Sequence, residues 1–173
     1  MFFSVQELEQ RRISFEVSVP PGEIEYLDKE LRQAGPLEAR GTVELLRNTL
    51  GEIRVRGHLK VTMETVCGRC LETAAVPVDS DYDLYYSPPR PAGHPAEEVE
   101  LHAGEAEIAF YEGDGLHLND ILREYVLLAL PMHPVCSDAC QGICPVCGQN
   151  RNLCACGCEV KPVDDRWAAL INL

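Results

Sequence analysis

The sequence lacks several features that identify whole classes of protein. No apolar run approaches the roughly 20 residues that a membrane-spanning helix needs. Charge appears as early as Glu7, too soon for the apolar core of a secretory signal. We therefore expect a cytoplasmic protein without a membrane partner. Phosphate-binding glycine loops and nucleophile-elbow motifs are also missing, and the five histidines are scattered, so we expect neither catalysis nor a small-molecule substrate.

Basic charge is scarce as well. The chain has 15 Lys and Arg against 28 Asp and Glu, which gives a formal net charge of −13. Most of the imbalance falls in residues 71–130, where two basic residues face thirteen acidic ones. Such a chain is not a typical nucleic-acid binder. The acidity favours contact with a basic partner, or serves solubility alone.

Apolar and polar residues alternate along several segments, which predicts β-strands. A strand is expected at 13–19, and a hairpin with arms at 38–47 and 52–66 joined by a turn at 48–51. Further strands are expected at about 74–86 and 106–111, and a short helix at 23–33. Residues 87–104, rich in Pro, Gly, Ala and Glu, predict a solvated, mobile loop.

Residues 119–130 have the pattern of a helix that begins at an Asn119 N-cap and ends before Pro131. Its second half is apolar all round, so we expect that half to be buried. A short apolar helix is expected at 167–173. We thus expect an α+β fold: a small antiparallel β-sheet or partly closed barrel with one buried helix over 1–131, and a Cys-rich segment with a terminal helix over 132–173.

Nine cysteines stand in spacings typical of metal ligands. A two-residue gap lets one tight turn aim two thiolates at the same ion, and Gly148 permits the positive φ that closes such a turn. Without an export signal, metal binding explains these clusters better than disulfides do. The candidate ligands are Cys67, Cys70, Cys136, Cys140, Cys144, Cys147, Cys156 and Cys158, which leaves Cys154 spare.

Eight thiolates are enough for two four-thiolate zinc sites. One arrangement joins Cys67 and Cys70 to Cys136 and Cys140, and the other four thiolates form the second site. A single C-terminal site remains possible, so we expect one or two structural Zn²⁺ ions. An iron–sulfur cluster and a Cys67–Cys70 redox pair are the alternatives. All-thiolate sites lack the open position that hydrolysis needs, so the metal is expected to be structural.

The chain resembles the YceD family of large ribosomal RNA subunit accumulation proteins. The resemblance rests on Cys67-Gly-Arg-Cys70-Leu71, on Leu127-Leu-Ala-Leu-Pro131, and on Cys136-x3-Cys140-Gln-Gly-Ile-Cys144-Pro-Val-Cys147-Gly148. Asn152, Cys156-x-Cys158 and Asp164-x-Arg166 extend it, so that it spans residues 67–173. It implies a role in 23S rRNA accumulation and hence in biogenesis of the large ribosomal subunit.

We therefore expect a non-enzymatic factor that binds a ribosomal protein, precursor rRNA of the large subunit, or both. Arg54, Arg56, His58 and Lys60 share one strand face and are the candidates for phosphate contact; the alternative is an ordinary solvated face. A second hypothesis is a metal-dependent rRNA-processing enzyme with Mg²⁺ on Asp79, Asp81 and Asp83. A third is a redox switch built on the zinc thiolates.

Overall fold

The computed structural model describes residues 1–49, 51–88 and 108–158, and these form two compact units. The first unit consists of Met1–Thr65 and Ala75–Met132. The second consists of residues 66–74 together with the chain from His133 onward. The predicted loop at 87–104 lies almost entirely outside the described residues, and the predicted helix at 167–173 lies wholly outside them.

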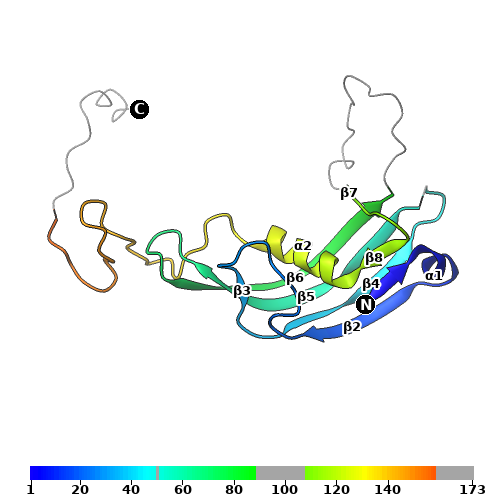
Figure 1. The fold of residues 1–173 in the computed structure, drawn as a ribbon, viewed down its shortest axis with the longest axis horizontal. Coiled ribbons are helices and arrows are strands. Elements are labelled where there is room, and N and C mark those ends of the chain that lie inside the picture. The colour runs from blue at the N-terminus through cyan, green and yellow to red at the C-terminus, as the bar shows by residue number, and fades with distance from the viewer. Residues whose placement is uncertain (50, 89–107, 159–173) are drawn as a thin grey trace, which may run out of the picture. The chain divides into compact units, whose positions relative to one another are not determined.

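The first unit is built on a sheet with the strand order β2-β4-β5-β6-β7 (Figure 1). These strands are β2 (Ile13–Val19), β4 (Leu37–Leu45), β5 (Ile53–Val66), β6 (Thr73–Ser87) and β7 (Ile108–Phe110). The predicted strand at 13–19, the hairpin, and the strands near 74–86 and 106–111 are therefore confirmed. Alternation explains why these strands could be predicted, because β5 buries Ile53, Val55 and Leu59 while Arg54, Arg56 and Lys60 are at least partly exposed.

Several details differ from the prediction. β6 and β7 pair in parallel, so the sheet is mixed, and within the described residues it does not close into a barrel. A separate antiparallel pair joins β1 (Phe2–Ser4) to β8 (Gly115–His117). The short helix α1 (Val5–Gln10) was not predicted; Ser4 caps it by accepting a hydrogen bond from the Glu7 N–H at 3.2 Å.

The predicted helix at 23–33 is wrong. The structure has only the two-residue strand β3 (Arg32–Gln33) there, which pairs antiparallel with β5. Ile24, Leu31 and Gln33 are buried, whereas most of their neighbours are exposed. Ile24, Leu27 and Leu31 would share one face of a helix, but Leu27 is 89% exposed in the structure. Pairing of β3 with β5 satisfies backbone groups there instead.

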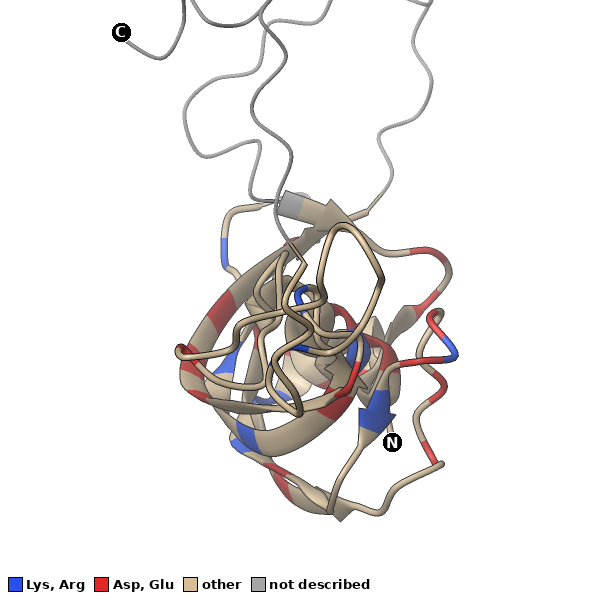
Figure 2. Ribbon diagram, turned by 90° about the vertical axis from the view of Figure 1, so that its left-hand side faces the viewer, with Lys and Arg blue, Asp and Glu red and all other residues tan. Residues whose placement is uncertain are grey.

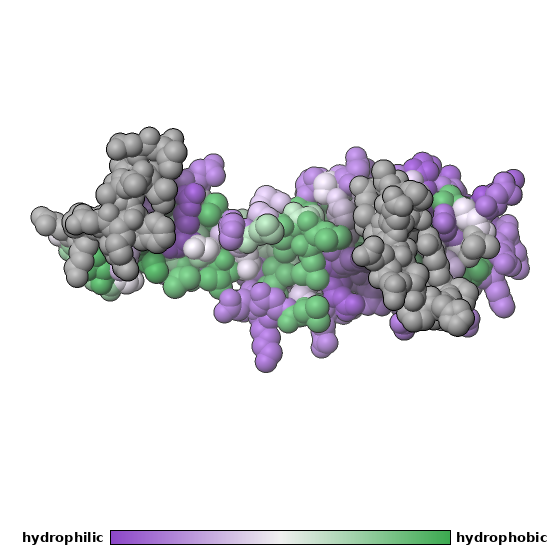
Figure 3. Space-filling view, turned by 90° about the horizontal axis from the view of Figure 1, so that it is seen from above, coloured by the Kyte–Doolittle hydropathy of each residue, from purple (hydrophilic) through white to green (hydrophobic). Residues whose placement is uncertain are grey.

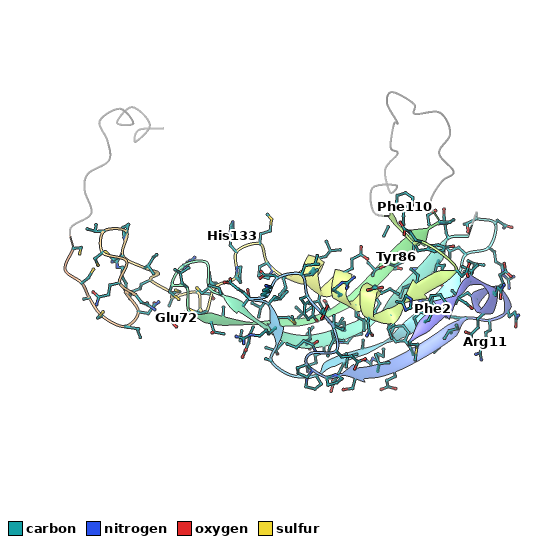
Figure 4. All side chains as sticks on the ribbon, viewed as in Figure 1. Phe2, Arg11, Glu72, Tyr86, Phe110 and His133 are labelled. Atoms are coloured by element: carbon teal, nitrogen blue, oxygen red, sulfur yellow. The ribbon has the colours of Figure 1, made fainter. Side chains whose placement is uncertain are left out.

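Helix α2 (Leu118–Ala129) packs on the core face of the sheet and confirms the predicted helix (Figure 1). Its buried residues are Leu118, Ile121, Leu122 and Val126. The Tyr86 hydroxyl of β6 donates to the Glu124 carboxylate at 2.9 Å and ties the helix to the sheet (Figure 4).

Two expectations about α2 are corrected. The N-cap is His117 rather than Asn119, and its side chain makes no capping hydrogen bond. The second half is not buried all round, because Leu128 is 70% exposed. One side of this half faces away from the sheet, and Figure 3 shows apolar surface over the helix. Neither α1 nor α2 has the length and apolar character that a membrane crossing requires.

A glycine pair allows β4 and β5 to approach closely. Gly41 and Gly57 stand opposite each other in the register of the two strands. A Cβ atom at Gly41 would lie 2.5 Å from the Arg56 carbonyl oxygen, and a Cβ atom at Gly57 would lie 2.7 Å from the Tyr82 hydroxyl. Only glycine fits this part of the sheet without displacing the backbone.

Candidate metal centres

Four cysteines of the second unit form the first thiol group. Cys67 and Cys70 come from the loop between β5 and β6, and Cys136 and Cys140 come from the chain after α2. Their sulfurs all lie within 4.8 Å of one another, and three of the four residues are buried. The structure thus brings together thiols more than 60 positions apart in the sequence.

The sulfur spacing of the first group has the dimensions of a tetrahedral metal site. The Sγ atoms of Cys67 and Cys140 are 3.9 Å apart, and those of Cys70 and Cys136 are 3.7 Å apart. Four sulfurs at the zinc–thiolate distance of about 2.3 Å form a tetrahedron with edges of about 3.8 Å. A disulfide would need about 2.05 Å between sulfurs, and all nine cysteines are free thiols.

Cys144, Cys147, Cys156 and Cys158 form the second thiol group. Their sulfurs also lie within 4.8 Å of one another. Cys144 is buried and the other three are at least partly exposed. Cys154 belongs to neither group; it is exposed, and its sulfur lies 3.8 Å from the Asn150 carbonyl oxygen. The two groups of four match one of the arrangements that the sequence allows.

The two C-x2-C turns share one backbone pattern. In the second turn the Cys144 N–H donates to the Gln149 carbonyl and the Gly148 N–H donates to the Cys144 carbonyl, both at 2.8 Å. In the first turn the Cys67 N–H donates to the Glu72 carbonyl at 2.8 Å, and the Leu71 N–H donates to the Cys67 carbonyl at 3.0 Å. Figure 4 labels Glu72 at this turn. The same pair of backbone hydrogen bonds therefore closes both turns.

In both turns the residue that follows the second cysteine has a positive φ, as predicted for Gly148. Gly148 has a φ of 72°, and Leu71, at the equivalent position of the first turn, has a φ of 64°. A non-glycine residue in this region costs about 1 kcal/mol or more. The sequence therefore keeps a strained leucine where the turn needs glycine geometry, and the surrounding hydrogen bonds hold it there.

Backbone N–H groups point at the first sulfur of each turn. At Cys67, N–H groups from Cys70, Arg69 and Cys136 lower the thiol pKa to about 6. At Cys144, N–H groups from Cys147 and Val146 lower the thiol pKa to about 6 as well. Hydrogen bonds of this kind stabilise a thiolate, which is the form that binds metal.

Crowding of the thiols has the opposite effect on other cysteines of the two groups, because it raises their pKa. The neighbouring thiols of Cys147 and Cys156, together with burial, raise the pKa of Cys158 to about 12. Each group therefore combines a readily ionised thiol with a partner that resists ionisation beside it. A divalent cation would remove that resistance, so the residues fit a metal ion chemically as well as geometrically.

Arg69, between the first two cysteines, ties their turn to residues 138–143. Its guanidinium donates to the carbonyls of Asp138 at 3.2 Å and Cys140 at 3.3 Å, and its own carbonyl accepts from the Ile143 N–H at 2.9 Å. Gly142 has a φ of 71°, and a Cβ atom there would lie 2.9 Å from the Arg69 carbonyl oxygen. The first thiol group is thus assembled by direct contacts.

The candidate phosphate-binding residues lie on the outward face of β5, opposite acidic residues of β6. Arg54 forms two hydrogen bonds with Asp83, at 2.8 and 2.5 Å. His58 contacts Asp79 at 3.0 Å and Asp81 at 2.9 Å, and Lys60 lies 3.6 Å from Asp79. Arg56 is exposed, and no carboxylate among the described residues pairs with it. Figure 2 shows basic and acidic segments side by side on the strands.

These ion pairs reduce the charge that is available to a ligand on both strands. The basic row on β5 is Arg54, Arg56, His58 and Lys60, and the acidic row on β6 is Asp79, Asp81 and Asp83. The Arg54 guanidinium lowers the pKa of Asp83, as expected for a carboxylate beside a fixed cation. The basic row offers less positive charge to a phosphate than its sequence indicates, because three of its four members contact carboxylates. The acidic row likewise has cationic neighbours where a Mg²⁺ ion would have to bind.

Sequence reasoning missed the role of Asn152. Its side-chain N–H donates to the Cys140 sulfur at 3.4 Å, and this hydrogen bond is the largest cause that lowers the pKa of the Cys140 thiol. Its side-chain oxygen accepts from the Gln141 N–H at 2.8 Å. Its position in the sequence could have indicated this role, since Asn152 lies between the pair Cys144 and Cys147 and the pair Cys156 and Cys158.

A family model described as large ribosomal RNA subunit accumulation protein YceD matches residues 55–173 of the chain. The match covers β5 from Val55 onward, β6, α2 and both thiol groups. No curated protein and no solved structure matches the chain.

Proposed function

The chain belongs to the YceD family of large ribosomal RNA subunit accumulation proteins, and from this premise we propose that it acts without catalysis in biogenesis of the large ribosomal subunit. In this role it supports accumulation of 23S rRNA by binding a component of the growing particle. The family match carries the proposal. The geometry of the charged and thiol-rich sites supports its non-catalytic part.

The metal part of the proposal is one structural Zn²⁺ ion in each thiol group. Sulfur distances of 3.7 and 3.9 Å in the first group, and of less than 4.8 Å in the second, favour a single ion over a cluster, because a multi-iron cluster spreads its thiolates over separate iron atoms. Zinc suits four thiolates in a tetrahedron. Four protein ligands leave no position for a reactive water, so each ion would stabilise the second unit rather than perform hydrolysis.

The charged face argues against a metal-dependent nuclease. The Mg²⁺ candidates Asp79, Asp81 and Asp83 contact Arg54, His58 and Lys60. A cation would have to displace these groups before it could bind. The ion pairs therefore support a stable, mixed-charge surface in place of a catalytic one.

Of the two partners, a basic ribosomal protein has the stronger support. The formal net charge of −13 favours association with a basic surface. Phosphate groups, in contrast, would have to compete with carboxylates for Arg54, His58 and Lys60. Contact with precursor rRNA would then be secondary and centred on Arg56.

A tagged pull-down from lysate, with and without RNase, tests the proposal. We expect a large-subunit ribosomal protein that stays bound after RNase treatment. Loss of the bound material with RNase would identify precursor rRNA as the direct partner. Recovery of no large-subunit component, together with unchanged 23S rRNA after deletion of the gene, would refute the function.

The role of the basic row is tested by an Arg54→Glu/Arg56→Glu/Lys60→Glu variant in the same pull-down. A matched control carries the same charge change at exposed arginines elsewhere, Arg11→Glu/Arg32→Glu/Arg47→Glu. A protein partner that does not use the basic row binds both variants equally. Weaker RNA recovery with the first variant alone would show that the row contacts phosphate.

A further inference from the structure

One side chain connects the two thiol groups. Asn152 lies in the segment between Cys147 and Cys156, which both belong to the second group. Its side-chain nitrogen nevertheless lies 3.4 Å from the sulfur of Cys140, a member of the first group. The donor for one group is therefore supplied by a loop whose two ends are held by the other.

The Asn152 amide is fixed in orientation. Its oxygen accepts a hydrogen bond from the Gln141 N–H at 2.8 Å. Its nitrogen also donates to the Asn150 side-chain oxygen at 2.9 Å, and that oxygen accepts from the Asn152 backbone N–H at 3.0 Å. These contacts leave the second amide hydrogen directed at the Cys140 sulfur, so the amide acts as a donor there and not as an acceptor.

Apart from the second thiol group, hydrogen bonds alone anchor the loop that carries Asn152. Residues 151–155 are all exposed and therefore bury no apolar side chain. The start of the segment is held by backbone hydrogen bonds from Cys144 to Gln149 at 2.8 Å and from Arg151 to Gly142 at 2.9 Å. Side-chain hydrogen bonds join Asn150 to Glu72 at 3.5 Å and Asn152 to the Gln141 N–H at 2.8 Å. Metal bonds to Cys147 and Cys156 would close the loop on both sides of Asn152.

We infer that Asn152 couples the two metal sites, so that a metal ion in either thiol group raises the affinity of the other group for its ion. An ion in the second group fixes the loop, and the loop presents the Asn152 N–H to the Cys140 thiolate. A four-thiolate site with a divalent ion carries excess negative charge, which an N–H donor offsets. The effect is reciprocal, because coupling between two binding equilibria has one value in both directions.

This inference rests on the proposed binding of zinc by both groups. It is tested on the full chain by titration with Zn²⁺ in competition with a chelator, and with Co²⁺ as a spectroscopic probe of the thiolate ligands. Cys147→Ser disables the second group, and Cys136→Ser disables the first. Each should lower the metal affinity of the remaining group about 10–100-fold, the range typical for loss of a hydrogen bond to a metal ligand, and by the same factor in both variants.

The Asn152→Ala variant tests whether Asn152 is the residue through which the two sites are coupled. It should lower the affinity of the first group about tenfold and abolish the further loss caused by Cys147→Ser. Asn152→Asp keeps the size of the side chain but removes the donor, so it should act in the same direction if the alanine variant folds poorly. Leu153→Ala, at a 78% exposed side chain of the same loop, is the matched control and should leave both affinities unchanged.

The outcomes separate the inference from the proposed function. If Cys147→Ser leaves the first group's affinity unchanged, the sites are independent and the inference is wrong. If the losses from Asn152→Ala and Cys147→Ser simply add, the coupling does not pass through Asn152 and the inference fails as stated. If neither group binds Zn²⁺, the metal part of the proposed function fails first.

Discussion

Removal of metal should unfold the second unit and leave the first folded. The reason is the difference between their cores. The first unit buries a continuous apolar cluster from both the sheet and α2. The buried cluster of the second unit consists of Ala74 and three candidate ligands, Cys67, Cys70 and Cys140, with Val135 partly buried against it. The other buried side chain in the described part of this unit is Cys144, also a candidate ligand, so without a metal ion the unit has no substantial apolar interior.

The magnitudes support this difference. At about 0.8 kcal/mol per buried CH₂ group, the side chains of Ala74 and Val135 contribute only a few kcal/mol. A structural zinc ion in a small domain contributes about 10–16 kcal/mol of apparent binding free energy near neutral pH. The metal contribution therefore exceeds the apolar contribution of this unit several-fold. We expect the second unit to be folded with metal and unfolded without it.

The assay is two-dimensional ¹H–¹⁵N NMR of the full chain before and after chelation, with metal content measured on the same samples. Amide signals of residues 67–72 and 136–158 should collapse into the range of a disordered chain. Signals of β4, β5 and α2 should keep their dispersion, and added Zn²⁺ should restore the rest. Chelator already loaded with zinc is the control. Dispersed signals from residues 136–158 at zero metal content would refute the reasoning.

Three further predictions concern single side chains. Leu122→Ala should destabilise the first unit by about 2–5 kcal/mol in urea denaturation, since this side chain is fully buried. Leu128 is 70% exposed in the same helix, so Leu128→Ala should change the free energy of unfolding by less than about 0.5 kcal/mol. Similar losses of stability in the two variants would contradict the packing of α2. Asp83 has a lowered pKa in the folded state, so its stabilising contribution is present above its unfolded pKa of about 3.9 and is lost as the pH falls through the lowered folded value. The difference in stability between the wild type and Asp83→Asn should therefore be small, constant near neutral pH, and absent at the lowest pH values, and an increase on acidification would contradict the ion pair. Cys154→Ser should keep two metal ions per chain by elemental analysis, whereas Cys144→Ser should keep one; one ion in both variants would place Cys154 among the ligands.

The charged face shows how far a sequence pattern can mislead when one strand is considered alone. Arg54, Arg56, His58 and Lys60 form a basic row by period-two alternation, and this geometry is correct. Its electrostatic meaning depends on β6, which places three aspartates beside it. Strand pairing involves residues about 20 to 30 positions apart, and alternation within one strand carries no information about that neighbour.

Local chemistry by itself determined a large part of this protein. Alternation defined the hairpin and the long strand β6, and the Cys-Pro-Val-Cys-Gly sequence defined a turn whose hydrogen bonds join residues no more than five positions apart. The candidate thiol ligands follow from the same short spacings. Each of these features depends on neighbours along the chain, which is why the sequence suffices for them.

Tertiary structure decided which of these local pieces meet. It brought Cys67 and Cys70 to Cys136 and Cys140, and it left Cys154 outside both groups. It also made β7 parallel to β6 and exposed one side of the second half of α2. The choice among pairings depends on close packing and on hydrogen bonds between distant segments, such as those made by Arg69 and Asn152. Cysteine spacing therefore defined the candidate ligands, and contacts across the fold defined how they group.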